Sequence, residues 1–135
     1  MAKNNRRLGV LVEHEIIRTF AEYFGLISYK APKWQIASTR AVSKVRDDEG
    51  VDIVFRNCKL RNLAVQVKRT VVNSETTSRI DIEPLIRILD EEEPVLITRL
   101  FKKHGKVNRN KGDFATIPFS HYLKLLDAYH SSKQH

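Results

Sequence analysis

The chain has few of the residues that build a covalent or membrane-bound framework. Cys58 is the single cysteine among 135 residues, so it can form no internal disulfide and has no partner for a zinc knuckle. No apolar run approaches the length of a membrane span, and the basic start, residues 1–7, is not followed by a signal-type apolar core. We therefore expect a soluble, cytosolic (cytoplasmic) protein in a reducing compartment, with no membrane partner.

Acidic residues are also scarce relative to basic ones. The chain has 16 Asp and Glu against 24 Lys and Arg, which gives a formal charge of +8. A balance this basic indicates a polyanionic partner, and nucleic acid is the first candidate, although solubility alone is the simpler explanation. The length and the apolar fraction of 41% fit one globular domain over residues 1–135, with a frayed start at 1–7.

The spacing of apolar residues predicts one α/β domain around a mixed β-sheet flanked by helices. Gly25 is well placed to end the first helix, and Pro118 to open the last. The expected elements are a helix at 8–24, a strand at 26–36, a mobile loop at 37–49, two strands within 51–67, a polar connection at 73–80, a helix at 82–89, a doubly buried strand at 94–101, a basic turn at 102–112, a strand at 114–117 and a final helix from 118.

Polar side chains interrupt the two apolar runs at the centre of the chain. Asp52 lies in the first run, 51–55, and Gln66 and Lys68 belong to the second. Because side chains alternate along a strand, Gln66 and Lys68 project from one face, with Val65 and Val67 directed oppositely. Pairing of the two strands would let Asp52 reach that face. We expect a carboxylate, an amide carbonyl and an ammonium group to converge there.

Three sequence features together resemble the PD-(D/E)xK nuclease superfamily. They are Gly50-Val51-Asp52, Gln66-Val67-Lys68 and a glutamate, Glu13, on the first helix, with Val51 in place of the usual Pro and Gln66 in place of the second acid. The helix ending Tyr23-Phe24-Gly25 before a strand is similar to the opening of archaeal-type Holliday junction resolvases. The approach Asp48-Glu49-Gly50-Val51-Asp52 and the Gln before the Lys are similar to Mrr-like restriction nucleases. The resemblance covers about residues 8–101 and implies a restriction-endonuclease-like fold.

The resemblance also implies a metal-dependent DNA endonuclease that uses Mg²⁺ or Mn²⁺. Hydrolysis of a phosphodiester needs charge neutralisation at phosphate and an activated water, which a hard cation held by oxygen ligands supplies. Asp52, Gln66 and the Val67 carbonyl would be ligands, with Glu13 completing the outer shell. Lys68 would hold the attacking water or the phosphate. Ser38 lies where resolvases often carry a serine that assists cleavage, and a passive loop serine is the alternative.

The substrate of the resembled enzymes is DNA, and a homodimer would suit cleavage of two symmetric strands of a Holliday junction. The alternatives are a restriction- or repair-type duplex nuclease, and a non-catalytic DNA-binding module with a decayed site, for which Gln66 is the main argument. The basic residues expected to contact DNA are Arg6, Arg7, Arg40, Lys44, Arg69, Lys102, Lys103, Lys106, Arg109 and Lys111.

Overall fold

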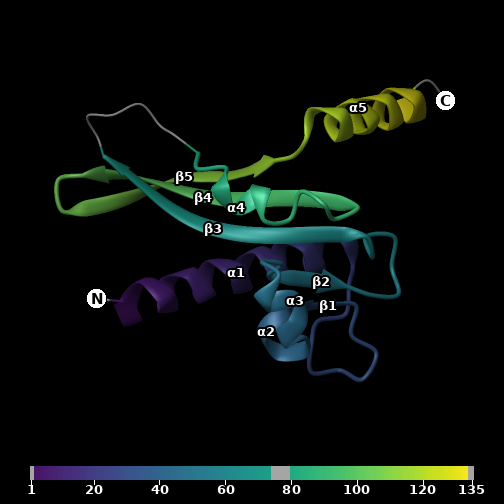
Figure 1. Ribbon diagram of the computed structural model, residues 1–135, viewed down its shortest axis with the longest axis horizontal. Coiled ribbons are helices and arrows are strands. Elements are labelled where there is room, and N and C mark those ends of the chain that lie inside the picture. The colour runs from purple at the N-terminus through teal and green to yellow at the C-terminus, as the bar shows by residue number, and fades with distance from the viewer. Residues whose placement is uncertain (1, 74–79, 134–135) are drawn as a thin grey trace.

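In the computed structural model, the described residues, 2–73 and 80–133, form a mixed five-stranded sheet flanked by helices (Figure 1). The strands lie side by side in chain order, from β1 to β5. The elements are α1 (Ala2–Phe24), β1 (Ile36–Ser38), α2 (Thr39–Val42), α3 (Lys44–Asp48), β2 (Ile53–Phe55), β3 (Leu63–Asn73), α4 (Glu83–Ile86), β4 (Glu93–His104), β5 (Val107–Thr116) and α5 (Phe119–Lys133).

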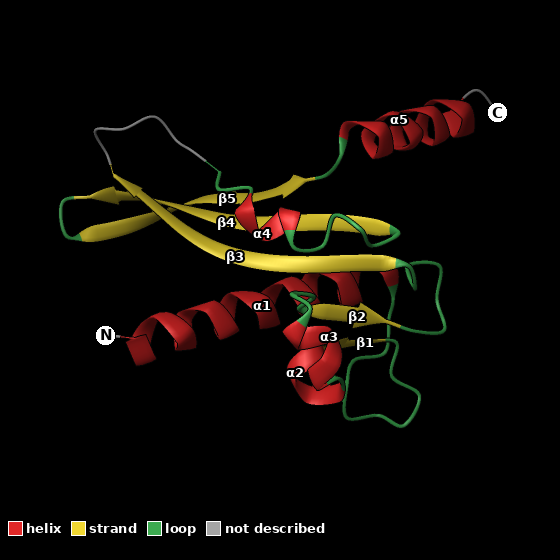
Figure 2. Cartoon of the chain, viewed as in Figure 1, coloured by secondary structure: helices red, strands yellow, loops and turns green. Residues whose placement is uncertain are grey.

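The sheet combines short and long strands (Figure 2). β3 and β4 pair in parallel along their whole length, from Leu63 beside Glu93 to Asn73 beside Lys103. The other neighbouring strands pair antiparallel, and β2 pairs with β3 through Ile53 and Val65. The predicted pair of antiparallel strands within 51–67 is therefore confirmed, and the second strand continues well beyond its predicted end.

Each face of the sheet has its own apolar core. On one face, Val12 and Ile16 of α1 pack with Ile53, Val65 and Val95. On the other, Leu85 and Ile88 pack with a separate group of side chains, Val51, Ala64 and Leu96. Strand alternation accounts for this division, because Val65 and Ala64 are neighbours on β3 that serve opposite cores. We call these the α1 face and the α4 face.

The first third of the chain departs from the sequence-based expectation in three places. The helix expected at 8–24 begins earlier, at Ala2, and so includes most of the basic start, 1–7. The strand expected at 26–36 is wrong: turns fill most of this segment, and the strand is the short β1. Lys30 has a φ of +96°, which interrupts an extended backbone, and Pro32 lacks the N–H that a ladder requires. The loop expected at 37–49 is also wrong, since it contains the end of β1 followed by α2 and α3.

The second half follows the expectation more closely. The helix expected at 82–89 is present as the short α4, and the strand expected at 94–101 lies within β4, where most side chains are buried. The basic turn expected at 102–112 is mostly strand, because β4 and β5 continue through it and turn only around Gly105. Most of the polar connection expected at 73–80 lies outside the described residues.

The final helix stands apart from the sheet at the end of β5 (Figure 1). Its large apolar side chains are therefore exposed, including Phe119, Tyr122, Leu123 and Leu125. Among the described helices, including α1 and α5, none is both long and apolar enough to cross a membrane.

Candidate functional site

Asp52 directly precedes the first residue of β2, and its side chain extends the hydrogen bonding to β3 beyond the end of the strand. The Asp52 N–H donates to the Val65 carbonyl at 2.7 Å, as in a regular ladder. The next donor along β3, the Val67 N–H, donates instead to Asp52 Oδ2 at 2.8 Å. The carboxylate thus satisfies a backbone group that the end of β2 leaves without a strand partner. Asp52 is only 8% exposed.

Gln66 meets Asp52 as the sequence predicted. Its Nε2 donates to Asp52 Oδ2 at 2.8 Å, because a carboxylate can only accept. The amide oxygen, Oε1, is buried and has no hydrogen-bond partner among the described residues. An unpaired buried acceptor of this kind usually marks a site that binds something further. Gly50 leaves room for this oxygen: at φ +95°, a Cβ there would come within 3.3 Å of it.

Glu13 reaches the same region from α1 and is 2% exposed. Ser38 Oγ donates to Glu13 Oε1 at 2.7 Å, and Arg40 Nη2 lies 3.5 Å from Glu13 Oε2. Ser38 is the register partner of Ile53, so this cluster lies beside Asp52. Glu13 lies close enough for its charge to act on Asp52, and the serine expected in a loop is a buried strand residue with a defined bond. The ion-pair partner of Glu13 is Arg40.

The surroundings of Asp52 oppose its ionisation. Burial raises its pKa from 3.8 to about 6, and the Val67 N–H, which stabilises the carboxylate, offsets part of that effect. The negative charge of Glu13 raises the pKa further, whereas Arg40 lowers it. A buried carboxyl group with a pKa near neutrality, close to a second acid, is the electrostatic pattern typical of functional sites.

Lys68 belongs to the α4 face but does not join the carboxylates. Its side chain is exposed, and it forms no ion pair with the residues that the structure describes. The expected convergence is therefore complete for Asp52 and Gln66 only. Thr98 lies beside Lys68 in the register of β3 and β4, and Thr98 Oγ1 is buried with no hydrogen-bond partner in the described chain.

The oxygen atoms around Asp52 fit a hard divalent cation. Among the described residues, both hydrogen bonds to this carboxylate use Oδ2 and none reaches Oδ1, and Gln66 supplies the buried unpaired Oε1. The Val67 carbonyl points to the same edge of β3 as its N–H, toward Asp52. Carboxylate and carbonyl oxygens are preferred ligands of Mg²⁺. Over the described residues, however, no three His, Cys, Asp or Glu side chains cluster as a metal site, so the fit depends on neutral oxygens.

Two residues of this region were not singled out from the sequence. Thr39 is fully buried and donates from Oγ1 to the Val51 carbonyl at 2.7 Å, while its N–H donates to the Asp52 carbonyl at 2.9 Å. Thr39 therefore fixes two consecutive backbone carbonyls, those of Val51 and Asp52. Thr98 had one usable signal, since it is the sole polar residue in the apolar run 95–98. For Thr39, the polar segment around it gave no signal, because only the fold buries it.

The basic residues expected to contact DNA occupy several elements. Arg6 and Arg7 are exposed on α1, and Lys44 is exposed at the start of α3. Arg69 is partly engaged, with its guanidinium 4.6 Å from the ring centroid of Phe101. The others lie on the hairpin of β4 and β5: Lys102, Lys103, Lys106, Arg109 and Lys111.

Asp52, Gln66, Ser38 and Glu13 are thus assembled around the junction of α1, β1, β2 and β3. The chain was compared with protein-family models, with curated proteins and with solved structures. No family model, no curated protein and no solved structure matches it.

Proposed function

We propose that this protein is a metal-dependent DNA endonuclease with a restriction-endonuclease-like arrangement of its mixed sheet. The observation that carries the proposal is the buried pair of Asp52 and Gln66, with Glu13 beside it. A carboxyl group that is 8% exposed, with a pKa raised to about 6, is costly to keep in a fold unless it has a use. The sequence resemblance to PD-(D/E)xK nucleases supports the same assignment.

In this proposal, Asp52 Oδ1, Gln66 Oε1 and the Val67 carbonyl would hold Mg²⁺ or Mn²⁺. The bound cation would supply Lewis-acid stabilisation of the charge that develops on the phosphate during hydrolysis. Cation binding would displace the Asp52 proton, whose pKa is about 6 in the metal-free chain, so the affinity for the cation should fall as the pH drops below that value. Because Gln66 is neutral, most of the attraction for the cation comes from Asp52, with a further contribution from Glu13.

The remaining residues would position the substrate. Lys68 is exposed, unpaired among the described residues and on the face that carries Gln66, so its ammonium group can hold a phosphate oxygen or the attacking water. Ser38 would keep the Glu13 carboxylate oriented through its hydrogen bond. Arg40 is 39% exposed, so it can pair with Glu13 and still approach a phosphate.

We further propose that the substrate is branched DNA and that the active form is a homodimer. A four-way junction presents two symmetric strands, and two copies of one site can cut both. Four exposed apolar side chains of α5 favour a second copy as the partner: Phe119, Tyr122, Leu123 and Leu125 are 48–72% exposed. They offer on the order of 400 Å² of surface, since a large side chain buries roughly 150–250 Å². That is about half of one side of a standard interface.

The decisive experiment compares cleavage of a labelled four-way junction and a linear duplex of the same sequence, with and without Mg²⁺. We expect Mg²⁺-dependent cleavage that is faster on the junction and is lost in Asp52→Asn. Equal cleavage of both substrates would support the duplex nuclease instead. Full activity in a folded Asp52→Asn protein would exclude this site.

The alternative is a DNA-binding module that keeps the fold without the chemistry. Two observations on the described residues favour it. No three metal-ligating side chains form a cluster, and Lys68 forms no ion pair. Such a protein would bind both DNA substrates in the absence of metal and cleave neither at any Mg²⁺ or Mn²⁺ concentration.

A further inference from the structure

The basic residues of the β4–β5 hairpin are divided between the two faces of the sheet. On β4, Lys102 and His104 continue the alternation that places Leu96 in the core of the α4 face. Lys103 lies between them and therefore projects from the α1 face. On β5, Arg109 is the register partner of Lys102. The basic residues, which are continuous in the sequence, therefore project from both faces of the sheet.

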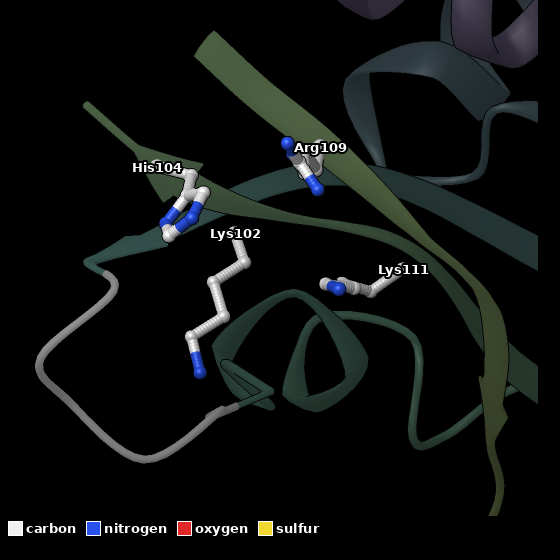
Figure 3. A pocket seen from close by; sticks show the side chains of 4 residues that line it. All are labelled: Lys102, His104, Arg109 and Lys111. Atoms are coloured by element: carbon white, nitrogen blue, oxygen red, sulfur yellow. The ribbon is translucent and has the colours of Figure 1, made fainter. Parts of the chain in front are cut away.

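Four of these side chains line one pocket of about 250 Å³: Lys102, His104, Arg109 and Lys111. Figure 3 shows them directed toward a common space on the side of the hairpin that faces α4. Among the described residues, no carboxylate lines this pocket and none of the four side chains forms an ion pair. The nearby acid of β5, Asp113, is already bonded to Arg99 at 2.8 Å and 3.0 Å. The pocket therefore gathers basic side chains for which the described residues supply no counterion.

The pocket lies on the face that carries Gln66 and Lys68. Lys102 is the register partner of Val72, four positions beyond Lys68 on β3. At the rise of a strand, this corresponds to about 13 Å along the sheet. A DNA duplex extends well beyond this length, so one bound duplex can contact both the pocket and the Asp52 site.

We propose that this hairpin pocket binds a backbone phosphate of DNA near the phosphate held at the Asp52 site and distinct from it. The proposal rests on the proposed function for the identity of the ligand. The pocket anchors the substrate without base contacts, because Lys and Arg donors recognise the phosphate and not the sequence. Lys103 and Lys106 take no part, although they carry the same charge on the same hairpin.

The test measures binding of a fluorescent duplex DNA by anisotropy without divalent cations, over a range of salt concentrations. The variant is Lys102→Ala/Lys111→Ala, and the matched control is Lys103→Ala/Lys106→Ala, which removes the same charge outside the pocket. We expect the pocket variant to weaken binding and to reduce the slope of log affinity against log salt by about 0.9, because one neutralised phosphate contact is lost. The control should keep the wild-type slope. Thermal melting of both variants should match the wild type, since the replaced side chains contribute to no apolar core cluster.

Equal slopes for the pocket variant and its control would overturn the proposal, because the hairpin would then act only through net charge. Failure of the proposed function looks different. If the pocket variant loses affinity but the wild type cleaves no DNA with Mg²⁺ or Mn²⁺, the pocket stands and the nuclease assignment fails. If cleavage depends on Asp52 while both double variants bind like the wild type, the nuclease assignment stands and the pocket fails.

Discussion

At the scale of single residues, the site is organised by the conflict between burial and charge at Asp52. Its carboxylate satisfies the Val67 N–H and the Gln66 amide, yet it is nearly enclosed and close to Glu13. Residues selected only for stability would not keep such a group. Because burial raises the pKa of Asp52 in the folded protein, stability falls as the pH rises, which is opposite to the contribution of an ion-paired aspartate with a lowered pKa.

We predict that Asp52→Asn stabilises the metal-free protein at neutral pH. The folded chain holds the Asp52 proton more tightly than the unfolded chain, with a pKa of about 6 against 3.8, so ionisation lowers the free energy of unfolding as the pH rises between these values. Asparagine keeps an acceptor oxygen and avoids this cost. Urea unfolding should show an advantage of up to about 3 kcal/mol above pH 6 that disappears near pH 4.

The control for this prediction is Asp48→Asn, because the Asp48 side chain is exposed. Its free energy of unfolding should follow that of the wild type at each pH. An advantage of Asp52→Asn that does not change with pH would mean that Asp52 titrates like a free carboxyl group in the folded protein.

Gln66 gives a second prediction at the residue scale. Gln66→Glu would place a second carboxylate where the amide now donates to Asp52 at 2.8 Å. The metal-free variant should melt at a lower temperature, because two adjacent carboxylates cannot both ionise cheaply. Mg²⁺ should raise its melting temperature more than that of the wild type, since a cation bound only by the folded state stabilises it by mass action.

Gln35→Glu is the matched control, because Gln35 bonds to backbone groups of Ile27 and Asn57 on another part of the fold. Its melting temperature should respond to Mg²⁺ as the wild type does. A Gln66→Glu protein that is destabilised without any added response to Mg²⁺ would assign Gln66 to the scaffold.

At the scale of elements, the site depends on how α1 is joined to β1 and α2. The two side chains that make this link to Glu13 are Ser38, at the end of β1, and Arg40, in α2. α1 packs on its own face of the sheet through Val12 and Ile16, so the polar link sets the position of Glu13 relative to Asp52. The elements that looked like a loop in the sequence are therefore part of the site.

We predict that Ser38→Ala lowers the free energy of unfolding by about 1–3 kcal/mol, because it removes a hydrogen bond from a carboxylate that is 2% exposed. The double-mutant cycle with Glu13→Gln isolates the interaction. In the Glu13→Gln background the same change should cost less, since no buried charge is left with one partner fewer. Equal costs in the two backgrounds would show that Ser38 contributes through packing alone.

At the scale of the whole molecule, α5 is a helix that contributes no residue to either apolar core among the described residues. It stands apart from the sheet (Figure 1), beside an apolar groove of about 510 Å³ that its Leu125 helps to line with Phe20, Val95 and Ile97. Exposed apolar surface of this extent is typical of an interface. A second copy can cover both the helix and the groove.

We predict that the wild type sediments as a dimer and that Phe119→Ser/Leu123→Ser sediments as a monomer. Both side chains lie on α5 and are largely exposed, so the double change should leave the fold of the protomer intact. Phe114→Ser is the control, since Phe114 is also exposed but lies on β5. A wild type that remains monomeric at all concentrations tested by sedimentation equilibrium would contradict the proposed assembly.

The sequence by itself determined the class of fold, the pairing of the strands around Asp52 and the shared face of Gln66 and Lys68. These follow from local periodicity, because alternation along a strand assigns each side chain to a face whatever else the chain does. The resemblance also singled out Glu13 on the first helix, but only the structure shows that it is buried.

Only the tertiary structure decided which polar groups outside the predicted strand pair reach the site. Ser38, Thr39 and Arg40 lie in a polar segment without periodicity, and their contacts join residues far apart in the chain, such as Ser38 with Glu13. The division of the basic hairpin into two faces likewise required the register of β4 with β5. Contacts between distant segments depend on how whole elements pack, and no local pattern of side chains encodes that packing.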